Sequence, residues 1–234
     1  MNTRTTRLLA CVGLALAFSA SMPSARANLL VDPGFEANPL DTASNVLNFF
    51  VTYQGVWGVE AATITGIDGG VTPVQGVKML RMTDDFQTTT QGFQATNVTS
   101  YAGLIDSGGA TINMSALFNV DKNTPAALAG VYVSFFTASN YGSLTTYIGN
   151  TLTLDNLPST WELISTSGAI PPGTRWLVSQ VAYNDALLVG NPGYVDAADL
   201  TITPEPATLA LLALGGLAML RRRRRDQRMC HSNA

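Results

Sequence analysis

The chain has 234 residues and a formal net charge of −3. Residues 28–203 carry four basic and fourteen acidic side chains, so this part alone has a net charge of −10. A surface of that sign repels the phosphates of nucleic acids, which excludes a nucleic-acid-binding function and leaves metal cations and neutral sugars as compatible partners.

The first 27 residues have the three parts of a secretory signal peptide. Two arginines form the positive start, and an uncharged apolar stretch follows from Leu8 to Ala20. The small residues Ala25 and Ala27 then give the pattern that signal peptidase recognises, so the mature chain is expected to begin at Asn28. The apolar stretch is too short for a permanent transmembrane helix, which needs about 20 residues.

Residues 28–203 are long enough for one domain with a full hydrophobic core. Apolar and polar residues alternate along this part, which predicts half-buried strands. The clearest inward-facing sets are Ile112/Met114/Ala116/Phe118, Val131/Val133/Phe135, Trp161/Leu163 and Trp176/Val178. Turn-forming stretches rich in Gly, Pro, Asp and Asn separate the strands at 68–70, 106–109, 171–173 and 190–193. We predict an all-β domain of about ten strands without a helix, folded as an antiparallel jelly-roll sandwich.

Residue types that common catalytic sites need are missing from this domain. The only histidine is His231, and the two cysteines are Cys11 and Cys230. All three lie in segments that we expect processing to remove. A serine–histidine–aspartate triad, a cysteine–histidine pair, a histidine-ligated zinc site and a disulfide are therefore excluded from the mature domain.

Paired carboxylates for glycoside hydrolysis receive little support from the sequence. Asp84 and Asp85 are neighbours, so on a strand they point to opposite faces. Asp196 and Asp199 also point apart if their strand is regular. A glycoside hydrolase needs two carboxylates facing each other across a cleft, so we predict that the domain is not an enzyme.

The start and the end of the domain resemble galactose-binding-like carbohydrate-binding modules. The resemblance rests on Asn28–Glu36 (NLLVDPGFE), on the following Trp57, and on the closing segment Tyr194–Thr201 (YVDAADLT). It implies a β-sandwich with a structural Ca²⁺ that ties the first strand to the last through Glu36 and Asp196. Calcium prefers several such oxygen ligands.

Aromatic rings that stack on sugars are the usual device of a glycan-binding surface. Seven aromatic residues are candidates for that role, although most are expected to lie in the core. They are Tyr53, Trp57, Tyr141, Tyr147, Trp161, Trp176 and Tyr183.

Residues 204–234 resemble the PEP-CTERM sorting tail of Gram-negative bacteria that make exopolysaccharide. The motif Pro204-Glu205-Pro206 is followed by an apolar helix expected at 207–220 and by a cluster of five arginines, Arg221, Arg222, Arg223, Arg224 and Arg225. The resemblance implies a transient inner-membrane intermediate that an exosortase cuts near the motif. The arginines are expected to hold the end of the tail in the cytoplasm. The same tail has also been described as an ice-binding-protein C-terminal domain.

These features predict an exported protein of the cell surface or extracellular matrix, with a non-catalytic glycan-associated or structural β-sandwich. Its expected partners are signal peptidase, exosortase, the inner membrane and exopolysaccharide. An adhesion or ice-binding surface protein and a glycoside-active enzyme are the alternatives. A regular array of threonines would favour ice binding, but Thr88–Thr90 is a single short cluster.

Overall fold

The computed structural model describes residues 27–37, 40–42, 49–83, 89–121, 127–184 and 191–204. Arg26–Pro204 forms one compact unit. The expected signal peptide up to residue 26, the pair Asp84 and Asp85, and the apolar helix and arginines expected at 207–225 lie outside the described residues. Among the residues that are described, no helix is long and apolar enough to cross a membrane.

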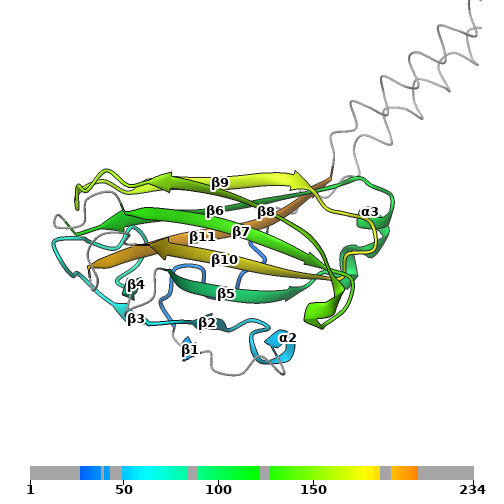
Figure 1. Ribbon diagram of the computed structural model, residues 1–234, viewed down its shortest axis with the longest axis horizontal. Helices are drawn as coiled ribbons and strands as arrows, with labels where there is room; N and C mark the ends of the chain where they lie inside the picture. The colour runs from blue at the N-terminus through cyan, green and yellow to red at the C-terminus, as the bar shows by residue number, and fades with distance from the viewer. Residues whose placement is uncertain are drawn as a thin grey trace, which may run out of the picture. The chain divides into compact units, whose positions relative to one another are not determined.

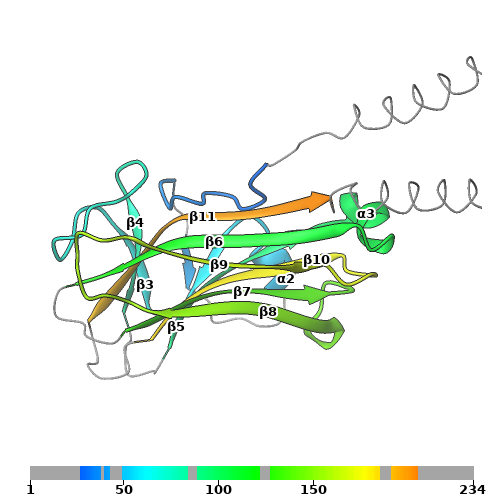
Figure 2. The ribbon, with the colours of Figure 1, turned by 90° about the horizontal axis from the view of Figure 1, so that it is seen from above.

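Two sheets packed face to face form the fold (Figures 1 and 2), which confirms the predicted β-sandwich. The six-stranded first sheet has the spatial order β1 (Leu40–Thr42), β2 (Trp57–Val59), β5 (Thr90–Asn97), β10 (Trp176–Asn184), β7 (Leu128–Phe136) and β8 (Leu144–Thr153). The five-stranded second sheet has the order β3 (Ala62–Thr65), β4 (Met79–Thr83), β11 (Pro192–Pro204), β6 (Ala110–Val120) and β9 (Glu162–Ala169). Neighbouring strands are antiparallel, except that β1 and β2 run parallel.

The core lies between the sheets and follows the predicted alternation. Ile112, Met114 and Phe118 of β6 are buried in it. Val131, Val133 and Phe135 of β7 are buried in it as well. The chain crosses from one sheet to the other between all consecutive strands except β1 and β2, β3 and β4, and β7 and β8. Such crossings are typical of a jelly roll.

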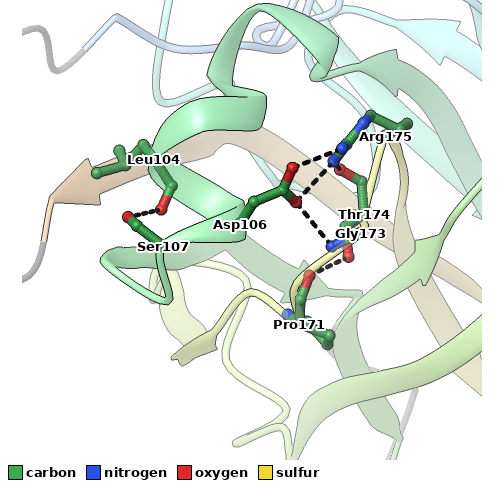
Figure 3. Close-up of polar contacts among 7 residues, drawn as sticks. All are labelled: Leu104, Asp106, Ser107, Pro171, Gly173, Thr174 and Arg175. Carbon is green, nitrogen blue, oxygen red and sulfur yellow. Dashed lines mark hydrogen bonds and ion pairs between the residues drawn. The ribbon is translucent and has the colours of Figure 1, made fainter.

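Short helices are present where none was predicted. They are α2 (Phe49–Thr52), α3 (Ala102–Asp106) and the 3₁₀ turns at Thr99–Tyr101 and Tyr141–Ser143. One or two turns are too short to produce a helical hydrophobic period, which is why the sequence did not reveal them. At the end of α3, Asp106 accepts hydrogen bonds from the Arg175 guanidinium at 2.7 and 3.0 Å and from the Gly173 N–H at 2.9 Å (Figure 3). The Arg175 guanidinium holds the pKa of the Asp106 carboxyl below its usual value.

A second apolar cluster covers part of the outer face of the first sheet. Phe50 from α2 and the following Tyr53 pack on Phe93, Ala95, Phe136 and Val178. This layer buries Val178 on the face opposite the core, and Trp176 packs against the same cluster. The predicted Trp176/Val178 pair therefore does share a face, but that face points away from the core, to which Leu177 and Val181 contribute instead.

The predicted phase of β9 is wrong. Leu163 is 62% exposed, whereas Ile164 is buried in the core. Trp161 precedes the strand and packs against Val71, Met79 and Tyr194 instead. Because side chains alternate with a period of two, an error of one residue exchanges the two faces of the strand.

A bulge in β11 overturns the expectation that Asp196 and Asp199 lie on opposite faces. The register with β6 shifts between these two residues, and Ala197 has a φ of +50°. Val195, Ala198 and Leu200 all belong to the core, so the side chains of Asp196 and Asp199 both point to the outer face.

Candidate functional site

The part of the first sheet that the second apolar cluster leaves uncovered carries the candidate site. Strand register brings together side chains that point away from the core. On β7, Tyr132 lies between Gln180 of β10 and Gly149 of β8, and the next outward residue, Ser134, lies beside Tyr147. We call this surface the outer groove.

The ring of Tyr132 occupies space that two glycines leave open. A Cβ atom on Gly149 would lie 2.1 Å from Cδ1 of this ring, and one on Gly130 would lie 3.0 Å from its Cε2. Any other residue at 149 would collide with the ring. The half-buried tyrosine is therefore held close against the sheet by glycines on its own strand and on the neighbouring one.

Two hollows flank Tyr132 along the strands. One has a cavity volume of about 80 Å³, and its outward-facing lining includes Gly130, Thr151, Ala182 and Asn184. The other has a cavity volume of about 260 Å³ and is lined by Tyr132, Ser134, Tyr147 and Gln180. Both are open surface hollows, and the ring of Tyr132 lines each of them.

Polar groups in the outer groove are hydroxyls and amides. Gln180 Nε2 donates to Gln91 Oε1, and Asn184 Nδ2 donates to Thr89 Oγ1 at 3.0 Å. Strands β5, β10, β7 and β8 contain no Asp, Glu, Lys or Arg at all, within a domain whose net charge is −10. The groove can therefore recognise a ligand through hydrogen bonds and ring contacts, but not through ion pairs.

Most of the seven aromatic candidates lie elsewhere. Trp57 and Tyr183 are buried in the core, and Tyr53 is buried in the second apolar cluster. Tyr141 and Trp176 contact Phe50 in the second apolar cluster. Tyr147, which is 64% exposed, is the candidate that lines the larger hollow of the outer groove.

Tyr132 was missed by the sequence analysis, although the sequence held a signal for it. Val131 and Val133 were correctly assigned to the core. The residue between two inward-facing neighbours must point outward on a strand. A tyrosine at that position, with a glycine two residues before it, indicates a ring presented on the sheet surface.

The predicted metal ligands Glu36 and Asp196 bind the same loop, residues 74–78. Glu36 Oε1 accepts the N–H groups of Val77 and Lys78, both at 2.8 Å. Asp196 Oδ2 accepts those of Val74 at 2.7 Å and Gln75 at 3.0 Å. The two carboxylates therefore hold the two ends of one loop.

The loop surrounds the two carboxylates with backbone N–H groups and the Lys78 side chain. Burial raises the pKa of Asp196, and the nearby charge of Glu36 adds to that rise, whereas the backbone N–H groups of the loop oppose it. Lys78 Nζ donates to the main-chain oxygen of Glu36 at 2.9 Å. Two carboxylates fit the oxygen preference of Ca²⁺. Among the described residues, however, no three acidic, histidine or cysteine side chains are placed to hold a metal ion together, so backbone carbonyls would have to complete the shell.

Solved structures with a similar fold include carbohydrate-binding modules. The module TmCBM61, solved in complex with β-1,4-galactotriose, is 14% identical, with a TM-score of 0.48 over 76% of this chain and 99% of that one. The C-terminal family 22 carbohydrate-binding module of Clostridium thermocellum Xyn10B is 16% identical, with a TM-score of 0.48 over 77% and 97%. An arabinose-bound MgGH51 α-L-arabinofuranosidase has 14% identity and a TM-score of 0.49, but only 26% of that chain is covered. At such values the similarity does not extend to function.

The comparison with protein families concerns the end of the chain. A search of curated proteins found no match. Residues 203–225 match the family model described as the PEP-CTERM protein-sorting motif, which confirms the prediction made from Pro204, Glu205, Pro206 and the arginines. This motif implies processing by an exosortase and export to the cell envelope. The chain therefore carries a PEP-CTERM sorting motif directly after a β-sandwich.

Proposed function

We propose that this chain is an exported surface protein whose β-sandwich binds neutral glycans in the outer groove without hydrolysing them. The observation that carries the proposal is the position of Tyr132, held against Gly130 and Gly149 between two hollows. An aromatic ring offers its apolar surface to a sugar, and the neighbouring hydroxyl and amide groups pair with sugar hydroxyls.

The charge of the domain supports neutral rather than acidic glycans. No basic side chain of β5, β10, β7 or β8 is available to pair with a carboxylate or sulfate, and the net charge of −10 repels such groups. Affinity is expected to be weak, because one or two ring contacts contribute a small binding free energy, whereas the loss of translational and rotational freedom on association costs several kcal/mol.

Absence of catalysis is supported by the same residues. No carboxylate lines either hollow of the outer groove, whereas glycoside hydrolysis needs two across the scissile bond. Asp196 and Asp199 lie on the outer face of the other sheet.

The proposed setting follows from the two ends of the chain. Signal peptidase removes residues 1–27, the tail is held briefly in the inner membrane, and an exosortase cuts near Pro204–Pro206. The sandwich then reaches the cell surface or the extracellular matrix of a Gram-negative bacterium, where exopolysaccharide is the proposed ligand.

Replacing Tyr132 by alanine tests the outer groove. The mature protein should be retarded by at least one neutral polysaccharide in affinity electrophoresis. Tyr132→Ala should weaken that binding about tenfold, which is the loss of affinity expected when one stacked ring is removed. Tyr147→Ala should weaken it as well, since this ring lines the larger hollow.

Leu163→Ala is the matched control for these variants. Leu163 is 62% exposed on the outer face of the second sheet, so its truncation removes similar exposed surface outside the two hollows of the groove. Binding that survives Tyr132→Ala, or release of reducing ends during the assay, would contradict the proposal.

We also propose that Ca²⁺ binds at Glu36 and Asp196. Two carboxylates that bind the two ends of one loop support this site. A ligand that binds only the folded state adds about 2.7 kcal/mol to the free energy of unfolding at a hundred times its Kd. The melting temperature should rise with Ca²⁺, fall with chelator, and lose this response in Glu36→Gln and Asp196→Asn. An unmodified protein whose melting temperature ignores Ca²⁺ would refute the site.

A further inference from the structure

We propose that one end of the sandwich lies against the lipid headgroups of the inner membrane while the sorting tail is held there, with the opposite end turned away from the lipid. This inference rests on the membrane-held tail proposed above and adds which surface of the domain meets the membrane. Three observations carry it: the position of Pro204, the length of chain that follows it and the distribution of charge.

Pro204 lies at an end of the sandwich that several loops share. It pairs with Ala110 where β11 ends, and Figures 1 and 2 show this end of β11 beside α3. The Arg175 N–H donates to Phe136 O at 2.9 Å, and the Arg175 carbonyl accepts the Val98 N–H at 2.8 Å. These bonds hold the loop before β10 against the ends of β7 and β5. We call this surface the Pro204 end, and it consists of residues 98–109, 137–143 and 170–175 together with Pro204.

Very little chain separates the Pro204 end from the membrane. Residues 203–225 match the sorting motif, and the expected apolar segment begins at residue 207. Glu205 and Pro206 alone stand between that segment and Pro204, so the Cα atoms of residues 204 and 207 are at most about 11 Å apart. Each of the two prolines also fixes a backbone torsion, which stiffens the connection. While the apolar segment is in the membrane, the Pro204 end is therefore the part of the sandwich that meets the headgroups.

The Pro204 end carries no net charge. Its loops contain one acidic and one basic side chain, Asp106 and Arg175. Two guanidinium nitrogens of Arg175 lie 2.7 and 3.0 Å from the two carboxylate oxygens of Asp106 (Figure 3), so the two charges compensate each other. The other three basic and thirteen acidic side chains of residues 28–203 lie outside this end and account for the whole net charge of −10. Anionic headgroups therefore repel the rest of the domain but not this end.

Acidic side chains lie at the opposite end of the sandwich. Asp121 directly follows β6, Asp155 lies just after β8, and Glu162 begins β9 opposite Phe118. β6 has eleven residues, so this end is about 33 Å from the Pro204 end at about 3.3 Å per residue. Repulsion by anionic lipid is thus strongest for the end farthest from the tail, which favours an upright sandwich. In that orientation the outer groove, which runs along the strands between the two ends, stays open to glycans.

Two matched serines test the orientation. Ser100 lies in the Pro204 end, Ser159 lies in the loop between β8 and β9 at the opposite end, and both are exposed. The chain from Asn28 to Ala234 with Cys230→Ser is reconstituted into vesicles of phosphatidylethanolamine and phosphatidylglycerol. It carries a fluorophore on Ser100→Cys or on Ser159→Cys. Lipids with nitroxide headgroups should quench the label at position 100 several-fold more strongly, because collisional quenching needs contact.

Flotation of the vesicles separates the two ways in which this experiment can fail. A chain that floats with the vesicles but is quenched equally at both positions would overturn the proposed orientation and leave the membrane-held tail standing. A chain that does not float would contradict the membrane-held tail, and this inference with it.

Arg175→Gln and Asp106→Asn test the role of charge as an opposed pair. Each variant breaks the same ion pair, but Arg175→Gln leaves the Pro204 end with a charge of about −1 and Asp106→Asn with about +1. On vesicles that contain phosphatidylglycerol, Arg175→Gln should lower the population quenched at position 100 about fivefold, whereas Asp106→Asn should not lower it. On vesicles of phosphatidylcholine, which have no net charge, the two variants should behave alike. Equal losses for both variants on the anionic vesicles would show that the ion pair acts only through the fold and would overturn the proposed role of charge.

Discussion

A chain that lacks residues 204–234 is expected to accumulate in the periplasm as soluble protein and to disappear from the cell surface. Residues 203–225 form the matched sorting motif, so the deletion removes the apolar segment and the arginines together. Without an apolar segment nothing holds the chain in the membrane, and without the motif the exosortase has no substrate. Cell fractionation followed by immunoblotting measures the change, which should be close to complete.

The arginines can be tested separately from the motif. Replacing Arg221–Arg225 by glutamine keeps Pro204–Pro206 and the apolar segment but removes the positive charge that resists translocation. The tail of this variant should become accessible to protease from the periplasmic side. A full deletion that leaves the protein at the cell surface would show that sorting does not depend on this tail.

Asp196→Ala is expected to lower the free energy of unfolding by about 3 kcal/mol, since a buried charged acceptor is lost and its donors stay buried without partners. The Asp196 carboxylate accepts the N–H groups of Val74, Gln75 and Ala197, and its residue is fully buried. Loss of this carboxylate should also free the 74–78 loop from β11. Urea denaturation of the mature protein measures the change in stability, and faster amide hydrogen exchange at Val74 and Gln75 would report the freed loop.

Asp199 supplies the control, because it lies on the same face of the same strand and the described residues give it no side-chain hydrogen bond. Burial raises the pKa of Asp199, so the folded state binds a proton more readily than the unfolded state does. Its contribution to stability is therefore largest below its unfolded pKa and is lost as the pH rises through the folded pKa. Asp199→Asn should stabilise the protein at neutral pH, and this gain should shrink as the pH falls. Equal losses for Asp196→Ala and Asp199→Asn would contradict our account of β11.

The sandwich could be predicted because side chains of central strands such as β6 alternate between a face that lines the core and a face that does not. β6 is the clearest case, since its side chains alternate strictly between buried and half-buried from Ala110 to Leu117. The start of β10 is apolar on both faces because Phe50 of α2 covers the outer one at Trp176 and Val178, and no local pattern reveals that cover. The bulge at Ala197 was equally hidden, since no glycine marks the position where φ is positive.

The outer groove could be predicted only in part. The outward direction of Tyr132 follows from its own strand, but the space for its ring comes from Gly149, which the register of β7 and β8 brings alongside. Register between strands depends on the whole sheet, so it cannot be predicted from the sequence of either strand alone. For the same reason, sequence pattern could not show that Glu36 and Asp196 would meet the 74–78 loop, which lies about forty residues from one and more than a hundred from the other.

The position of β11 determines how the domain responds to mechanical force. The sorting motif begins at residue 203, where this strand ends, so tension between the tail and the domain passes through β11. β11 lies between β4 and β6 and is paired with β6 from Gly193 to Pro204. Antiparallel hydrogen bonds run perpendicular to the strands, so a pull along β11 loads the bonds of this ladder together in shear. An edge strand peeled from its sheet would instead lose its bonds one after another.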